Sequence, residues 1–146
     1  MGIEMRIKTE VLDAMFKMAK VDKAAMYAAL IEMGPKELKA PLRKDWSPEN
    51  PTRNFCYVIA EFTLHFGAPS GSKAQSLVIP GDVAKHYYVL TPFGNVLDLA
   101  AEQFPDYSVV DYTAAKKANF MFPSPSRRSR RLAELMGYKN AYTYVA

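Results

Sequence analysis

The first third of the chain carries apolar residues at the three- and four-residue spacing that is typical of amphipathic helices. One stripe consists of Leu12, Met15, Phe16 and Ala19, and a second consists of Met26, Ala29, Leu30 and Met33. Asp22 precedes the second stripe and can cap a helix there, because a carboxylate accepts hydrogen bonds from free N–H groups. Gly34 and Pro35 then end that helix, since proline cannot continue the hydrogen-bond ladder. The pattern predicts two helices, followed by proline-interrupted turns over residues 35–51.

A narrower apolar stripe follows and predicts a central helix. Its members lie at i, i+4, i+7 and i+11 and are Phe55, Ile59, Phe62 and Phe66. Such a stripe calls for burial against a sheet or against other helices. The start of this helix has two alternatives. With Asn54 as the N-cap residue, Cys56 lies in the first turn, whereas a start at Asn50 and Pro51 places Cys56 deeper in the helix.

The middle of the chain changes to the pattern of strands. Three segments rich in Val, Ile, Leu and Tyr predict strands at residues 76–80, 85–90 and 95–99. The intervening residues Thr91 to Gly94 match a turn with proline at its second position, so the last two strands should form a hairpin. Beyond residue 99 the sequence predicts a helical turn through Gln103, a short strand near residues 107–112 and a final helix over residues 126–136. The expected fold is α+β, with the helices packed on a small antiparallel sheet.

Composition limits the number of domains and the chemistry. The 146 residues are 49% hydrophobic and 23% charged, which predicts one domain over residues 1–146. Within it we expect a helical part over 1–50, a helix-plus-hairpin core over 51–112 and a C-terminal helix within 113–146. A single cysteine and two histidines leave few ligands for a metal, so we expect no metal and no cofactor. The chain has no run of about 18 apolar residues, which predicts a cytoplasmic protein that does not enter the membrane.

The single cysteine, Cys56, is a candidate nucleophile only if a base lies beside it, because a lone cysteine is more often a small core residue. His65 follows nine residues later on the same predicted helix and points to its opposite side. Since the chain has only two histidines, His86 is the candidate base. Asp98 lies twelve residues after His86, across the predicted turn. A three-residue loop would put both side chains on one face of the hairpin, and an even-numbered loop would put them on opposite faces.

Cys56, His86 and Asp98 therefore form a candidate catalytic triad. In this hypothesis Cys56 attacks a carbonyl carbon, His86 carries the proton and Asp98 holds the imidazole in the required tautomer.

The segment from His86 to Phe104 also resembles a known family. His86-Tyr87-Tyr88, Leu90, Gly94, Asp98-Leu99 and Glu102-Gln103-Phe104 are similar to the pattern H-Y-W-N-x-L-x-x-G-x-x-x-D-L-T-x-x-Q-F of the small YunG-like proteins. The order of Cys on a helix, then His and Asp on following strands, resembles papain-like cysteine hydrolases related to NlpC/P60. The resemblance implies a papain-like fold and a hydrolase or acyltransferase acting on an amide, isopeptide or thioester bond of a peptide or acyl substrate.

The chain departs from that family next to the nucleophile, where Asn54 and Phe55 stand in place of Gly-Gln. The backbone N–H of Cys56 is one candidate oxyanion donor, and the side chain of Asn54 or Asn50 is a candidate for the second. Four aromatic residues near the proposed site are candidates for lining a substrate groove, namely Trp46, Tyr57, Tyr87 and Tyr88.

A cluster of arginines near the C-terminus supports a different hypothesis. Arg127, Arg128, Arg130 and Arg131 lie in the first turns of the last predicted helix, where the helix dipole disfavours cations. The protein would then be a non-enzymatic interaction or inhibitor protein, for example from a phage or another mobile element, that binds an acidic partner protein through these residues. A solvated helix face is the more common role of such a cluster. With a net charge of only +4, nucleic-acid binding is the weakest of the alternatives.

Overall fold

A computed structural model describes residues 5–82, 84–118 and 124–138 of the chain. Its class is α+β, as the sequence predicts. The α-helices are α1 (Thr9–Ala19), α2 (Lys23–Met33), α3 (Ala40–Arg43), α4 (Cys56–Phe66) and α5 (Arg127–Leu135). The strands are β1 (Lys73–Leu77), β2 (His86–Leu90), β3 (Val96–Leu97) and β4 (Lys116–Lys117). Four one-turn 3-10 helices connect them: η1 (Pro35–Glu37), η2 (Ala101–Gln103), η3 (Tyr107–Val109) and η4 (Tyr112–Ala114).

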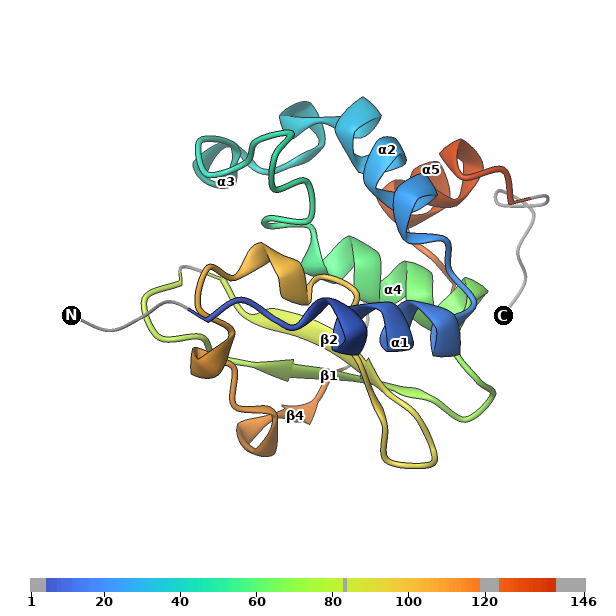
Figure 1. Cartoon of the computed structure of the whole chain (residues 1–146). Helices are drawn as coiled ribbons and strands as arrows, with labels where there is room; N and C mark the ends of the chain where they lie inside the picture. Colours follow the sequence, from blue (N-terminus) through green and yellow to red (C-terminus); the bar gives the residue numbers. More distant parts are fainter. Residues whose placement is uncertain (1–4, 83, 119–123, 139–146) are drawn as a thin grey trace.

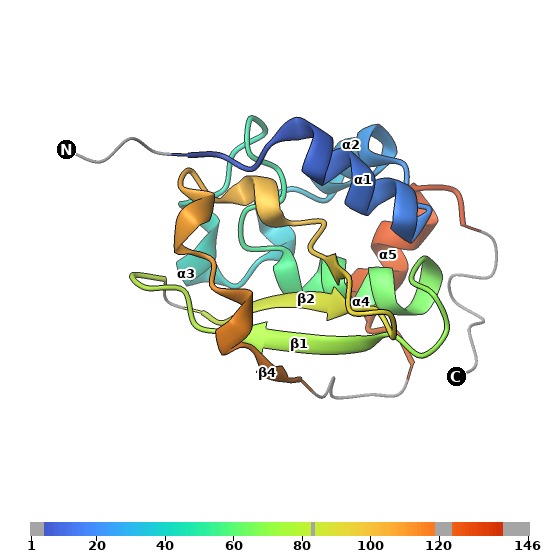
Figure 2. The same ribbon diagram turned by 60° about the horizontal axis from the view of Figure 1, so that its bottom comes forward.

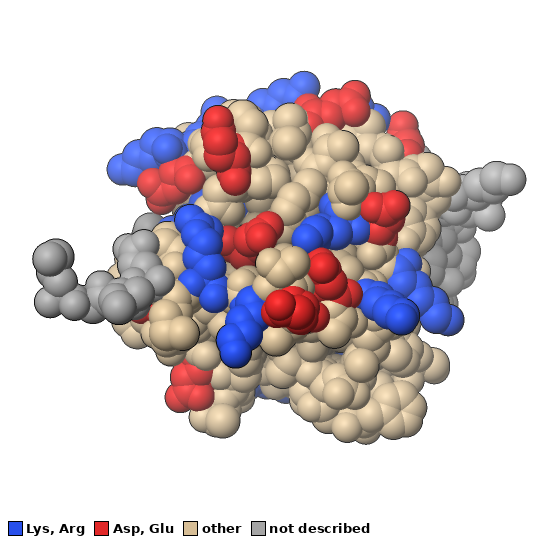
Figure 3. Space-filling model, in the orientation of Figure 1, with Lys and Arg blue, Asp and Glu red and all other residues tan. Residues whose placement is uncertain are grey.

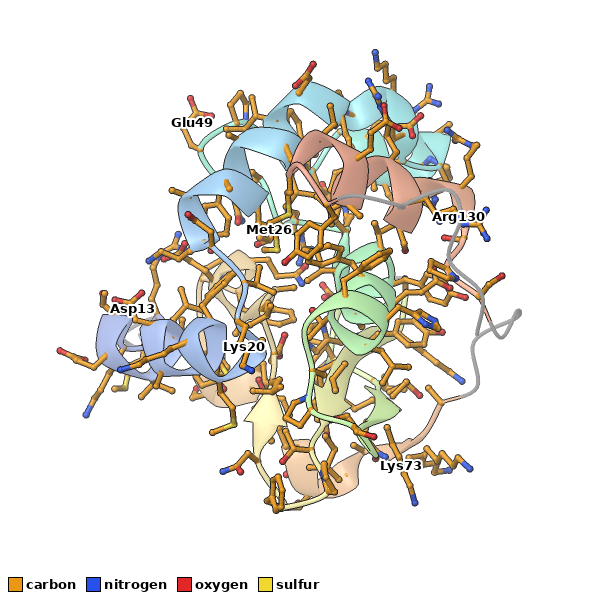
Figure 4. The ribbon with its side chains drawn as sticks, turned by 90° about the vertical axis from the view of Figure 1, so that its right-hand side faces the viewer. Asp13, Lys20, Met26, Glu49, Lys73 and Arg130 are labelled. Carbon is orange, nitrogen blue, oxygen red and sulfur yellow. The ribbon has the colours of Figure 1, made fainter. Side chains whose placement is uncertain are left out.

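The two N-terminal helices form where the apolar stripes predict them. The Asp22 carboxylate accepts a hydrogen bond from the Ala25 N–H at 3.0 Å, which confirms it as the cap of α2. Gly34 ends this helix with a φ of +65°, a value that favours glycine. Met26 points into the space between α2, α4 and α5, whereas Asp13 lies on the outer side of α1 (Figure 4). The stripe on α2 therefore faces the core.

The hairpin register settles the question that the sequence left open. Val89 pairs with Leu97 and Leu90 with Val96, and the Thr91 N–H donates to the Asn95 carbonyl at 2.9 Å. The loop therefore has three residues. This odd number puts residues 86 and 98 on the same face of the sheet, because side chains alternate with a period of two.

The full sheet is antiparallel with the strand order β3-β2-β1-β4. The strand predicted at residues 76–80 instead runs from Lys73 to Leu77, so its predicted position was too far along the chain. The chain turns at Ile79, whose carbonyl accepts from the Asp82 N–H at 3.0 Å. The two-residue strand β4 is too short to produce a recognisable pattern.

The strand predicted near residues 107–112 was wrong, and the 3-10 helices η3 and η4 occupy this region. Asp106 accepts from the Ser108 N–H at 3.1 Å, and Asp111 accepts from the Thr113 N–H at 3.0 Å. These local hydrogen bonds compete with a sheet ladder, because they hold the backbone in turns.

The helix α4 lies between the sheet and the pair of helices α2 and α5, and both ribbon views show this layering (Figures 1 and 2). It packs on β2 on one side and on α5 on the other, while α1 packs against β3. The main core surrounds α4, and a smaller apolar cluster contains Leu77, Ile79, Tyr88, Phe104 and Val110.

A buried carboxylate connects α4 to α5. Glu61 lies in the middle of α4 and is fully buried. Its Oε1 accepts from the Ser126 N–H at 2.9 Å, contacts the Ser126 hydroxyl and lies 2.5 Å from the Ser129 hydroxyl. Ser126 is the N-cap residue of α5, so Glu61 satisfies a free N–H where the helix dipole favours negative charge.

We predict that Glu61→Ala lowers the free energy of unfolding by about 3 kcal/mol, because it leaves buried donors without an acceptor. Urea denaturation measures the change. Glu134→Ala is the matched control: its exposed pair with Arg131, at 3.1 Å, should contribute less than about 1 kcal/mol. Equal losses in both variants would contradict this role for Glu61.

Candidate active site

The central helix begins at Cys56, with Phe55 in the N-cap position. Asn54 precedes them with a φ of +66°, in the left-handed region that Asn tolerates better than most residues. Asn50 forms an isolated bridge with Ser47 and residues 51–54 form turns, so the alternative helix start at Asn50 and Pro51 was wrong. Cys56 thus lies in the first turn. Its N–H has no acceptor within the helix, and the positive end of the helix dipole lies beside its sulfur.

His86 and Asp98 form a buried pair. The His86 Nε2 lies 2.6 Å from the Asp98 Oδ2, and the two side chains are 2% and 0% exposed. The carboxylate has two further donors: the Tyr112 hydroxyl reaches Oδ2 at 2.6 Å and the Ala100 N–H reaches Oδ1 at 3.2 Å. Phe104 packs edge-on against the imidazole, with 4.8 Å between ring centroids. The ring of His86 is therefore fixed in orientation.

Cys56 lies close to His86. The second ring nitrogen, Nδ1, is buried and has no hydrogen-bond partner within ordinary distance limits among the described residues. The thiol itself contacts the Lys85 carbonyl at 3.6 Å. Burial acts to lower the pKa of His86, but the charge and hydrogen bond of Asp98, with a smaller contribution from nearby Cys56, raise it to about 10. Nδ1 is the ring nitrogen available to the thiol, since Nε2 is held by Asp98.

A small recess of about 30 Å³ opens beside the sulfur, and Cys56, His86 and Gln103 are among its lining residues. This volume suits one water molecule or a carbonyl oxygen. At the recess, Arg53 pairs with Asp82 at 3.1 Å. The pair joins the segment before α4 to the loop before β2, and so ties the position of the thiol to that of the imidazole.

Gln103 presents an unused donor to this recess. The side chain is 2% exposed, and its Oε1 accepts from the Asn54 N–H at 3.2 Å. This bond identifies the oxygen, because a backbone N–H only donates. The Nε2 is buried and has no partner among the described residues. Sequence reasoning gave Gln103 no role, although the residue belongs to the segment that resembles the YunG-like pattern.

The two asparagines expected to supply the second oxyanion donor are engaged elsewhere. The Asn50 amide donates to the Gln103 carbonyl at 3.0 Å, and the Asn54 amide donates to the Leu42 carbonyl at 2.9 Å. Asn50 does not line the recess, and Asn54 lines it with its amide bonded to Leu42. Their expected role is therefore corrected: the unpartnered amide at this position belongs to Gln103.

A larger groove of about 630 Å³ also reaches Cys56. Its described lining residues are Lys39, Leu42, Asn54, Cys56, Tyr57, Val58, Ala84, Lys85, Tyr87, Ser126, Arg127 and Arg128. The volume is in the range of small-molecule and peptide sites. Five of these residues also line the recess, so Cys56 lies where the two spaces meet.

Two of the four aromatic groove candidates, Tyr57 and Tyr87, line this groove. Their rings pack edge-on, with 5.1 Å between the ring centroids. Tyr88 is buried against Tyr112 instead, because neighbouring residues of a strand point to opposite faces. Trp46 packs on the main core and donates its indole N–H to the Pro51 carbonyl at 2.9 Å. The expectations for Tyr88 and Trp46 are corrected.

The four arginines do not act as one patch. Arg127 and Arg128 line the groove, whereas Arg130 and Arg131 do not. Figure 4 shows Arg130 at the edge of the molecule, and its guanidinium contacts the Ser124 hydroxyl at 3.3 Å. On the face drawn in Figure 3, basic and acidic side chains are interspersed rather than separated by sign.

No known protein family, curated protein or solved structure matches this chain. Across residues 5–82, 84–118 and 124–138, no three His, Cys, Asp or Glu side chains gather as a metal site would require. The described helices are also too short or too polar for any of them to cross a bilayer.

The chain has two histidines whose pKa values shift in opposite directions, and NMR can resolve both. Burial lowers the pKa of His65 below 6.5, whereas the pKa of His86 is about 10. We predict that one imidazole titrates below pH 6.5 and that the other stays protonated to about pH 9. Asp98→Asn should lower the pKa of His86, because the charge of Asp98 raises it. Two midpoints near 6.5 would contradict this geometry.

The same shift predicts how stability depends on pH. Because folding raises the pKa of His86 from 6.5 to about 10, its contribution is complete below pH 6.5 and is lost as pH rises toward 10. The difference in free energy of unfolding between wild type and His86→Gln should therefore be larger at pH 6.5 than at pH 9.5, as measured by urea denaturation. A difference independent of pH would contradict the linkage.

Proposed function

We propose that the protein is a papain-like cysteine hydrolase or acyltransferase that acts on an amide, isopeptide or thioester bond. The observation that carries this proposal is the buried His86–Asp98 pair, whose free imidazole nitrogen is next to a cysteine at a helix N-terminus. A cysteine that served only to fill the core would not need a fixed imidazole or a groove beside it.

In the proposed mechanism, the Cys56 thiol transfers its proton to the Nδ1 of His86. The raised pKa of His86 favours the imidazolium, and Asp98 stabilises the positive charge. The thiolate then attacks the carbonyl carbon, and an S–C bond forms while the carbonyl oxygen becomes an oxyanion. The backbone N–H of Cys56 and the Nε2 of Gln103 are the proposed donors to that oxygen in the recess.

Collapse of the tetrahedral intermediate completes acylation. The bond to the leaving amine or thiol breaks, and the leaving group takes the proton from His86. The product is a thioester between the acyl group and Cys56. His86, now neutral, takes a proton from water or from an acceptor amine that attacks the thioester, after which the S–C bond breaks and the thiolate is regenerated.

The alternative function, an interaction protein that binds an acidic partner through its arginines, has less support. Arg127 already pairs with Glu37 at 3.2 Å, and Arg131 already pairs with Glu134 at 3.1 Å. In that alternative Cys56→Ala would leave the activity in cells unchanged, whereas reversing the charge of the arginines would abolish it. In the proposed function Cys56→Ala abolishes the activity.

Alkylation by iodoacetamide tests whether Cys56 is activated. At pH 6 an ordinary thiol with a pKa near 8.5 is less than about 1% ionised. Because His86 takes the thiol proton in the proposed mechanism, we expect native Cys56 to react at least about tenfold faster than the same cysteine in the unfolded protein. The matched control is the same cysteine in the protein unfolded by concentrated urea, with glutathione as a rate standard in both solvents. His86→Ala should remove the excess. An equal rate in native and unfolded protein would overturn the mechanism.

Gln103→Ala separates oxyanion stabilisation from activation of the thiol. Alkylation displaces iodide without forming an oxyanion, so its rate should stay near that of wild type. Acylation by p-nitrophenyl acetate does form one, and its burst rate should fall by about 10²-fold. If the variant lost both rates equally, Gln103 would be supporting the position of Cys56 and would not be an oxyanion donor.

A further inference from the structure

The groove beside Cys56 is lined by both apolar and basic side chains. Leu42 and Ala84 contribute aliphatic surface, and Tyr57 and Tyr87 contribute aromatic rings. The described charged side chains that line it are all basic and comprise Lys39, Lys85, Arg127 and Arg128. No Asp or Glu of the described ranges is among its lining residues. A ligand that fits it combines apolar groups with negative charge.

Three of these four cations lack a negatively charged partner within the described part of the chain. Arg127 is the exception, through its pair with Glu37. Arg128 contacts only the backbone carbonyl of Glu37, at 3.1 Å, and neither Lys39 nor Lys85 makes an ion pair with a described residue. Their charge is available to a ligand.

The arrangement of the cations favours carboxylates over a phosphate group. They come from three separate segments: Lys39 precedes α3, Lys85 precedes β2 and Arg128 lies on α5. A phosphate site typically gathers donors at one point, often at a helix N-terminus. At α5, the carboxylate of Glu61 already accepts the first N–H. Separated cations along a groove match carboxylates spaced along an extended chain.

Building on the function proposed above, we propose that the acyl donor is an acidic peptide. Its Asp or Glu carboxylates contact Arg128, Lys85 and Lys39, and its apolar portions rest on the wall formed by Tyr57 and Tyr87. The carbonyl to be attacked then lies at the junction of groove and recess, beside Cys56.

An affinity label tests the proposal and does not require the natural substrate. The probes are two iodoacetylated tripeptide amides, one with the sequence Glu-Leu-Glu and the other Gln-Leu-Gln. In each, the sulfur of Cys56 forms a bond to the CH₂ carbon, and iodide leaves. We expect the acidic probe to alkylate Cys56 roughly 5- to 10-fold faster at low ionic strength, with the advantage shrinking in about 0.5 M salt. Mass spectrometry of the intact protein measures both rates.

Variants of the chain locate the effect. Arg128→Gln and Lys85→Gln should each reduce the ratio of the two rates by roughly 2- to 3-fold. Arg131→Gln is the matched control, because Arg131 lies on the same helix but outside the groove, and its ratio should equal that of wild type. If Arg128→Gln does not fold, Lys39→Gln, at an exposed side chain, provides the same comparison.

Failure of this proposal can be distinguished from failure of the proposed function. Equal rates for the two probes in the native wild-type protein would overturn the acidic-peptide proposal, even if iodoacetamide still showed an activated thiol. A ratio that is lowered as much by Arg131→Gln as by Arg128→Gln would also overturn it, since the preference would then come from net charge. Because the ratio compares two probes that react with the same thiol, it measures the preference of the groove for acidic side chains whether or not the thiol is activated.

Discussion

The buried contact between His86 and Asp98 is the interaction on which the rest of the site depends. Removing two ionisable groups from water is costly unless each gains charge and hydrogen-bond partners. Here the carboxylate receives the imidazole, the Tyr112 hydroxyl and a backbone N–H, and the imidazole gains the carboxylate. The pair exists only because the three-residue hairpin loop puts both side chains on one face. A shift of one residue in this register would bury each group alone.

A second constraint is the position of α4, which carries the cysteine at its first residue. The helix lies between the sheet and α5, and the buried carboxylate of Glu61 joins it to the start of α5. The contact between Glu61 and α5 therefore positions both Cys56 and Arg128, which lines the groove. The Arg53–Asp82 pair adds a link between the segments that hold thiol and imidazole.

Two buried polar atoms that have no partner among the described residues give the recess its chemical character. An unsatisfied buried donor or acceptor costs about 1–3 kcal/mol, so such atoms are rare where only stability matters. The Nδ1 of His86 and the Nε2 of Gln103 both belong to residues that line the recess beside Cys56. A reacting thiol and a developing oxyanion would supply the missing partners, which is the arrangement expected of a site prepared for acyl transfer.

The sequence by itself determined the features that depend on local periodicity: the apolar stripes of α1, α2 and α4, the cap at Asp22, the hairpin turn and the final helix. It also reduced the candidate triad to one cysteine, one histidine and one carboxylate. Only the tertiary structure decided which polar side chains meet, because that depends on register and on helix boundaries that shift by a residue or two. It showed that Gln103, and neither Asn50 nor Asn54, has an unpartnered amide at the recess, and that the Tyr88 side chain is buried in the core. Local patterns contain no information about contacts between segments some fifty residues apart, such as the one between Asn54 and Gln103.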